Sequence, residues 1–266
     1  MPTERSADSA ARQIARIAVA PLTVEAFCGR TLQWAAERSG PPKIITYLNA
    51  HNLNVVFDNP EYGASLCEAD LVYADGMGVV WGWRWLGRLV PERVNAGDFI
   101  LDFCRRAAER KLSLYLIGSR PGVARKAAQR WAAEAPGLVI AGARDGYFPP
   151  EREAEIAEEI HRAAPSIVLA GMGVPRQELW TRRWAGAIGA PVVWCVGALF
   201  EYYAGERSRA PRWMRRCGLE WTWRLALEPG RLSGRYLAGN VRFLANLRKM
   251  RKAQGSGPGN GAGPNA

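Results

Sequence analysis

The sequence predicts an α/β fold built on a doubly wound, mostly parallel sheet, with a basic helical appendage at the C-terminus. Three observations lead to this prediction. Short apolar runs alternate with helical stretches of about 10 to 15 residues through the middle of the chain. With 266 residues, of which 48% are hydrophobic, the chain can bury one large core. Its basic excess is concentrated after residue 206.

The N-terminal elements begin after a predicted disordered leader, residues 1–19, which mixes charges of both signs and lacks the apolar centre of a signal peptide. A helix is predicted over residues 22–38, since Ser39-Gly40-Pro41-Pro42 would stop it. Next come a strand over 43–48, helices to about Glu68 with Pro60 starting the second, a strand over 71–73 and a helix to about Gly87.

Helices and strands then alternate regularly. The pattern predicts helices near 99–110, 121–135 and 150–163 and from Gln177, and strands near 112–117, 138–142, 166–170 and 191–196. We assign residues 20–206 to an α/β catalytic domain, 207–252 to a basic amphipathic appendage, and 253–266 to a disordered tail rich in Gly, Pro and Asn.

Asp75 follows the apolar run 71–73 and precedes a helical pattern, so it is expected at the carboxyl edge of the sheet. Open α/β sheets bind ligands at that edge, and a carboxylate there can accept a proton. Gly76 and Gly78 would let a substrate approach the backbone. The alternative is that Asp75 only caps the next helix.

Glycine-rich turns follow two other predicted strands, at Gly118-Ser119-Arg120-Pro121-Gly122 and at Gly171-Met172-Gly173-Val174-Pro175. Glycines before a helix expose backbone N–H groups that suit a phosphate or a carbonyl. Neither turn completes a dinucleotide or P-loop fingerprint, and ordinary βα turns often contain glycine.

Residues 207–252 hold 13 basic and 2 acidic residues, which equals the net charge of +11 of the whole chain. If 230–252 were one helix, Arg231, Arg235, Arg242 and Lys249 would share one face and an apolar stripe the other. Tryptophans lie among arginines upstream, as at membrane interfaces. The tail could therefore meet an anionic membrane, nucleic acid or a phosphorylated substrate, or simply pack on its own sheet. The apolar stripe and the tryptophans favour lipid over nucleic acid.

Five scattered cysteines form no CxxC pair, so neither a disulfide framework nor a zinc site is predicted, and a cytoplasmic protein is expected. No apolar run approaches the length of a membrane span. His161 lies in a charged helix and is expected to be solvated, whereas His51, close to Asn49, is a further acid/base candidate.

Eight motifs in order resemble the WecG/TagA/CpsF glycosyltransferases over about residues 40–250. They are Thr46-Tyr47-Leu48-Asn49-Ala50, Ala74-Asp75-Gly76-Met77-Gly78, Pro91-Glu92-Arg93-Val94 with Gly97-Asp98, Gly146-Tyr147-Phe148, Gly171 to Glu178, Val196-Gly197, Ala204-Gly205 with Arg209-Ala210-Pro211, and Leu219-Glu220-Trp221 with Arg224-Leu225 and Glu228-Pro229.

The resemblance implies an inverting, metal-independent enzyme without a cofactor, on a Rossmann-like sheet with a membrane-touching appendage. Such enzymes move a sugar from a UDP-sugar to a polyprenyl-diphosphate-linked sugar during assembly of teichoic acids, capsules or exopolysaccharides. We therefore expect an anionic membrane surface as a partner, no nucleic acid, and a location at the inner face of the cell membrane. Self-association through the apolar stripe stays open, as does the sugar: ManNAc, glucose or a uronic acid.

The resemblance also assigns roles to individual residues. Asp75 would be the general base, and Asn49 a substrate contact. Where some members have Thr-Pro-Asn this chain has Tyr47-Leu48-Asn49, so a threonine role passes to Thr46 or is absent. The remaining candidates are Arg93 and Gln177 in catalysis, and Gly76, Gly118, Tyr147, Gly171, Gly173, Pro175, Glu178, Arg224 and Arg231 in substrate binding, with the last two arginines holding the diphosphate.

Two other classes of function fit parts of the sequence. A nucleotide-dependent oxidoreductase would share the alternating pattern, but it should have a complete glycine fingerprint followed by an acidic residue. A non-catalytic module binding nucleic acid or membrane would explain the basic tail, and salt-sensitive retention on DNA would reveal the nucleic-acid form.

Overall fold

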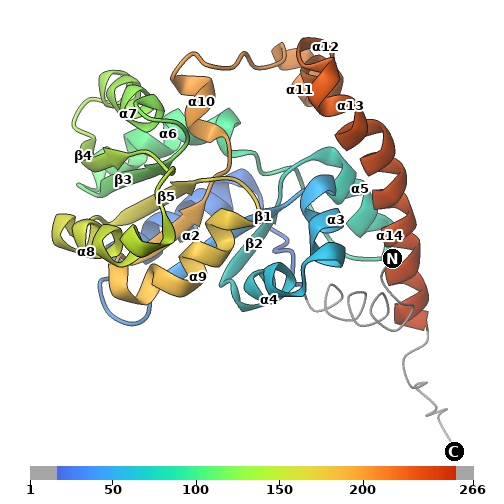
Figure 1. The fold of residues 1–266 in the computed structure, drawn as a ribbon, viewed down its shortest axis with the longest axis horizontal. Coiled ribbons are helices and arrows are strands. Elements are labelled where there is room, and N and C mark those ends of the chain that lie inside the picture. Colours follow the sequence, from blue (N-terminus) through green and yellow to red (C-terminus); the bar gives the residue numbers. More distant parts are fainter. Residues whose placement is uncertain (1–16, 256–266) are drawn as a thin grey trace, which may run out of the picture.

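The protein is built around a six-stranded parallel sheet with helices on both faces (Figure 1). The computed structural model describes residues 17–255. The strand order is β2-β1-β6-β5-β3-β4. The chain connects β1 to its neighbour β2 on one side, whereas β6 is connected to β5 on the other side, so the connections diverge between β1 and β6. Parallel sheets bind ligands in the crevice beyond the carboxyl ends of the strands at such a point. The strands are β1 (Lys43–Leu48), β2 (Leu71–Ala74), β3 (Ser113–Gly118), β4 (Val139–Arg144), β5 (Ile167–Gly171) and β6 (Val192–Cys195).

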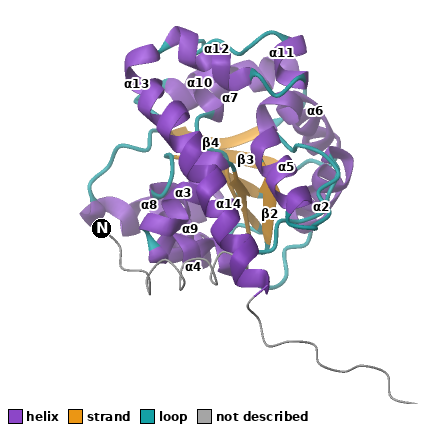
Figure 2. Cartoon of the chain, turned by 90° about the vertical axis from the view of Figure 1, so that its right-hand side faces the viewer, coloured by secondary structure: helices purple, strands orange, loops and turns teal. Residues whose placement is uncertain are grey.

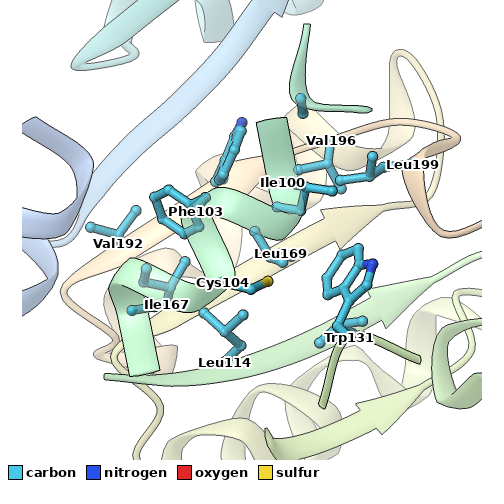
Figure 3. Packing of buried hydrophobic residues seen from close by; sticks show 14 of the residues in the cluster. Ile100, Phe103, Cys104, Leu114, Trp131, Ile167, Leu169, Val192, Val196 and Leu199 are labelled. Carbon is cyan, nitrogen blue, oxygen red and sulfur yellow. The ribbon is translucent and has the colours of Figure 1, made fainter. Parts of the chain in front are cut away.

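Both faces of the sheet are buried, which explains why its strands are apolar throughout. Along β3, Leu114 and Leu116 face one hydrophobic cluster while Tyr115 and Ile117 face another. Figure 3 shows the first cluster, in which side chains of one helix, including Phe103, pack against the strands.

The helices form three groups, each tied to one hydrophobic cluster. The first cluster lies under α2 (Val24–Ala36), α6 (Ala96–Glu109), α7 (Val123–Glu134) and α10 (Leu199–Tyr203). The opposite face is covered by α8 (Glu153–Ala163, after a 3₁₀ turn at Pro150–Arg152) and α9 (Arg176–Ile188). The third cluster joins α3 (Ala50–Asp58), α4 (Pro60–Glu68), α5 (Met77–Trp85) and α14 (Gly239–Gly255).

The predicted fold class is confirmed: every predicted strand is present, and each is followed or preceded by the expected helix. The leader needs a correction at its end. Ile17 and Val19 are buried in the third cluster, and Val19 pairs with Val72 of β2, so residues 17–19 are part of the fold because they cover an otherwise open edge strand. The rest of the leader lies outside the described residues.

Residues 230–252, treated above as one helix, are helical throughout, but this helix contains a π turn. After α11 (Arg212–Arg216) and α12 (Glu220–Leu227), the chain forms α13 (Pro229–Ser233), a π-helical turn (Gly234–Ala238) and then α14. Gly234 and Gly239 bound the widened turn, which changes the rotational phase of α14 relative to α13. Phe243 and Leu247 of the predicted stripe are therefore buried, while Leu237, Val241 and Leu244 are exposed.

The last helix is docked onto the body of the protein. α14 crosses in front of the sheet with α3 on one side and α5 on the other (Figure 2). Asn246 donates a 3.0 Å hydrogen bond to Asn54, and Asn54 donates one of 2.8 Å to the carbonyl of Gly239. Residues 253–255, predicted to belong to a disordered tail, continue this helix.

Candidate active site

A cavity of about 880 Å³ opens beyond the carboxyl ends of β1, β2 and β6 and extends between α5 and the C-terminal helices. This is the position expected from the strand order. Of the residues singled out in the sequence, those lining the cavity include Asn49, His51, Asp75, Gly76, Gly78, Arg93, Gly173 and Arg224.

Asp75 lies at the base of the cavity, one residue beyond β2. Its backbone N–H still pairs with Leu48, which fixes the chain at the sheet edge. The N-cap of α5 is Gly76, with φ of +121° and no side-chain capping bond, so the alternative that Asp75 caps this helix was wrong. Instead the Asp75 carboxylate accepts a 2.6 Å hydrogen bond from Nδ2 of Asn95.

The pKa of Asp75 is raised above its ordinary value because the surrounding walls remove water from the carboxylate. The nearby Arg93 and the hydrogen bonds from Asn95 and Asn49 act in the opposite direction, and Glu220 adds to the rise. A carboxylate with a raised pKa is a stronger proton acceptor when ionised, which suits a general base.

Asn49 is placed by its own capping role. It is the N-cap of α3, where its side chain accepts a 3.0 Å hydrogen bond from the N–H of Asn52. A Cβ on Gly76 would lie 3.9 Å from that of Asn49, so the two turns meet across the cavity base.

A network of charges forms one wall of the cavity. Asp98 makes ion pairs with Arg93, Arg209 and Arg215, and Glu220 lies 3.4 Å from Arg93 and 3.7 Å from Arg209. Three guanidinium groups thus share two carboxylates. Glu220 and Arg215 come from the C-terminal segment, whereas Arg93 and Asp98 come from the body, so the network ties the two together. A bound anion could replace a carboxylate in such a network.

Three of the predicted catalytic or binding residues are behind the cavity rather than in it. Gln177 and Glu178 are buried in the first turn of α9, and Thr46 donates a 3.1 Å hydrogen bond to Glu178. Gln177 donates one of 2.7 Å to the same carboxylate and accepts one of 3.0 Å from the N–H of Gly197, which lines the cavity. Burial raises the pKa of Glu178 to about 8. This cluster supports the base of the cavity from behind. At the end of β1 it is Tyr47, and not Thr46, that lines the cavity.

The remaining predicted residues lie elsewhere. Gly118 and Gly171 sit side by side on β3 and β5, where a Cβ on Gly118 would come within 2.3 Å of the Gly171 carbonyl oxygen. Tyr147 is exposed, and Pro175 borders a separate, smaller cavity. Arg231 is in α13, and its side chain is outside the described part of the chain. His161 is exposed, 3.2 Å from the carbonyl of Ile188 at the end of α9.

Several site residues were missed although their motifs are visible in the sequence. Asn95, the N-cap of α6, ends the loop that contributes Arg93, and Asp98 lies in the first turn of α6 that follows it. Arg209 and Glu220 belong to motifs that carry the family resemblance, but they were given no role of their own. The charged residues of these motifs, separated by more than 100 positions, were the available signal.

Residues 12–256 match the family described as "Glycosyl transferase WecG/TagA/CpsF family". The chain belongs to this family. A relative from Bacillus spizizenii (strain ATCC 23059 / NRRL B-14472 / W23), named N-acetylglucosaminyldiphosphoundecaprenol N-acetyl-beta-D-mannosaminyltransferase, is 31% identical over 173 residues. That match covers 65% of this chain and 66% of the relative, just under two thirds of its length.

Membership in a WecG/TagA/CpsF glycosyltransferase family sets aside the oxidoreductase and the non-catalytic module. Within residues 17–255 no helix is both long enough and apolar enough to span a bilayer. The same part of the chain contains no group of three or more His, Cys, Asp or Glu side chains arranged to hold a metal ion.

Proposed function

We propose that this glycosyltransferase inverts the anomeric centre as it moves a sugar from a UDP-sugar to a polyprenyl-diphosphate-linked sugar, in the assembly of a cell-surface polysaccharide. The observation that carries the proposal is the partly buried Asp75 at the base of a large cavity with an arginine-rich wall. The named activity of the Bacillus relative makes N-acetylmannosamine the first donor sugar to test, and an N-acetylglucosaminyl diphosphate lipid the first acceptor.

In the proposed reaction a hydroxyl of the acceptor sugar attacks the anomeric carbon of the donor, and the bond from that carbon to UDP breaks. Asp75 takes the hydroxyl proton, a step that contributes roughly 10²- to 10⁴-fold to the rate. Asn95 and Asn49 hold the carboxylate in place.

The negative charge of the departing UDP is balanced by guanidinium groups rather than by a divalent ion. The arginines that line the cavity are Arg93, Arg207, Arg215 and Arg224. Cations aimed at a developing charge stabilise the transition state more than the ground state, which is what lowers the barrier. Gly173 leaves space for the donor beside the backbone, because a Cβ there would meet no atom within 4 Å.

Contact with a membrane surface is part of the proposal. The C-terminal segment carries the net positive charge of the chain, and Trp213, Leu237 and Val241 are exposed on it. Basic side chains near an anionic surface contribute about 1 kcal/mol each. A variant combining Arg212→Glu with Trp213→Ala should sediment less with anionic liposomes than the wild type, and equal sedimentation would argue against this contact.

The central test is Asp75→Asn. This variant keeps the shape of the side chain but cannot accept the proton, so it should fold normally and lose transfer by about 10²-fold or more. The assay offers a panel of UDP-sugars, beginning with UDP-N-acetylmannosamine, to a polyprenyl-diphosphate-linked N-acetylglucosamine. Near-wild-type turnover would remove Asp75 as the base.

A further inference from the structure

An apolar groove leads from the catalytic end of the cavity along α5. Met77, Trp81 and Trp85 are spaced four residues apart, so they share one face of this helix, and all three line the cavity. Leu244 and Leu247 of α14 form the facing wall. From residue 77 to residue 85 the helix rises about 12 Å, so the groove extends well beyond the space around Asp75.

Three of the large apolar side chains in this groove are exposed. Trp81 is 56% exposed, Trp85 46% and Leu244 55%. Large apolar groups gathered at a cavity wall mark a binding surface rather than a core. Close packing bounds the groove on two sides: a Cβ on Gly82 would come within 2.8 Å of Leu247, and one on Gly218 within 2.8 Å of Met77.

Charge is distributed unevenly along the cavity. Arg93 and Arg215, which share Asp98, lie at the end near Asp75, whereas apolar side chains of α5 and α14 line the groove. At its far end the guanidinium of Arg251 lies over the ring of Trp85, 4.4 Å from its centre. The matching ligand has an anionic head and an apolar tail within one molecule.

We propose that the groove formed by Met77, Trp81, Trp85, Leu244 and Leu247 binds the first isoprene units of the acceptor, next to its diphosphate. The inference rests on the proposed function, and it adds that the enzyme takes part of the lipid chain out of the bilayer instead of presenting its cavity only to the headgroup. Burying apolar chain against two indole rings stabilises the complex in proportion to the area removed from water.

Binding measurements without any sugar test the groove directly. Inorganic pyrophosphate, isopentenyl diphosphate and farnesyl diphosphate are titrated into the full-length protein by calorimetry, below the micellar concentration of each. The affinity should rise with chain length, by about tenfold or more from the five-carbon to the fifteen-carbon chain. The double variant Trp81→Ala/Trp85→Ala should lose most of this gain and keep its affinity for pyrophosphate. Leu89→Ala, which removes a 73% exposed side chain outside the cavity, is the matched control and should behave as the wild type.

Equal affinity for the two lipid diphosphates would overturn the inference, as would an unchanged gain in the double variant. UDP is titrated into both proteins as well. Weaker UDP binding by the double variant, with the chain-length gain intact, would assign the indoles to the nucleoside site. A change in oligomeric state with the gain intact would assign them to a contact between copies. The proposed transfer reaction can fail while the chain-length gain persists, so the two proposals are distinguishable.

Discussion

Asn95 donates a 2.6 Å hydrogen bond from Nδ2 to Oδ1 of Asp75 and accepts, at its own Oδ1, a 3.1 Å hydrogen bond from Arg209. The second bond fixes which end of the amide faces the carboxylate, because only the oxygen can accept from a guanidinium. Arg209 follows α10 and Asn95 precedes α6, so the orientation of Asp75 depends on two distant segments.

Removing the hydrogen bond from Asn95 to Asp75 should change the pH dependence of sugar transfer. The ionised form of Asp75 is the active one, so activity is lost as pH falls through its pKa. In Asn95→Ala the ionised form loses a hydrogen bond, its pKa rises further, and the acidic limb of kcat/KM should move to higher pH. Activity well above the limb should fall less. A limb at the wild-type position would show that Asn95 does not act through Asp75.

Replacing Arg93 should lower the catalytic activity strongly, although the residue is part of an ion-pair network. Arg93→Ala removes a cation from the cavity wall and leaves Asp98 and Glu220 with fewer partners. We expect kcat/KM to fall by about 10²-fold or more, mainly in kcat, since the charge on UDP develops during the reaction. Arg182→Ala breaks an exposed pair with Glu68 away from the cavity and serves as the control. Similar losses in both variants would indicate a general structural effect.

Glu178 should make the protein less stable at alkaline pH. Its pKa rises from an ordinary 4.5 to about 8 in the folded state, so the folded state holds a proton that the unfolded state releases. The stability from this proton is complete below about 4.5 and is lost as pH rises to about 8, at about 1.4 kcal/mol per pH unit. Glu178→Gln should therefore unfold at a higher temperature than the wild type at pH 8.5, with the difference disappearing at pH 5. A constant difference would contradict the raised pKa.

Phe243 should hold the last helix in place. Its ring is buried against α5, and a Cβ on Gly78 would lie 3.6 Å from it. Phe243→Ala should cost about 3 kcal/mol of stability and increase hydrogen exchange in α14 before the rest of the protein. Leu237→Ala, at an exposed position before α14, should leave exchange unchanged. Uniformly faster exchange across the sheet would mean that α14 does not open on its own.

The sheet could be predicted because each strand is a short apolar run bounded by turn residues, and burial on both faces requires that pattern. Asp75 could be placed at the sheet edge for the same reason. The direction of the side chains at the end of β1 was harder to predict, since Thr46 points to Glu178 while Tyr47 borders the cavity. One residue of register decides between a buried partner and a substrate contact.

Which apolar side chains of the C-terminal segment are buried could not be predicted, for a different reason. Helical periodicity assumes a constant angle between residues, and the π turn at Gly234–Ala238 changes that angle. Contacts such as Glu220 with Arg93 join residues that are far apart in sequence, and local patterns carry no information on such pairs. The charged residues in the family motifs were the available sign of these long-range contacts.

The docking of α14 between α3 and α5 has a consequence for synthesis on the ribosome. Chains emerge N-terminus first, so α3 and α5 are available long before Phe243, Leu247 and Met250 can cover them. Until then the nascent protein exposes an apolar surface. A truncated protein that ended before residue 239 would keep this surface exposed and would be prone to aggregate, even if its catalytic groups were intact.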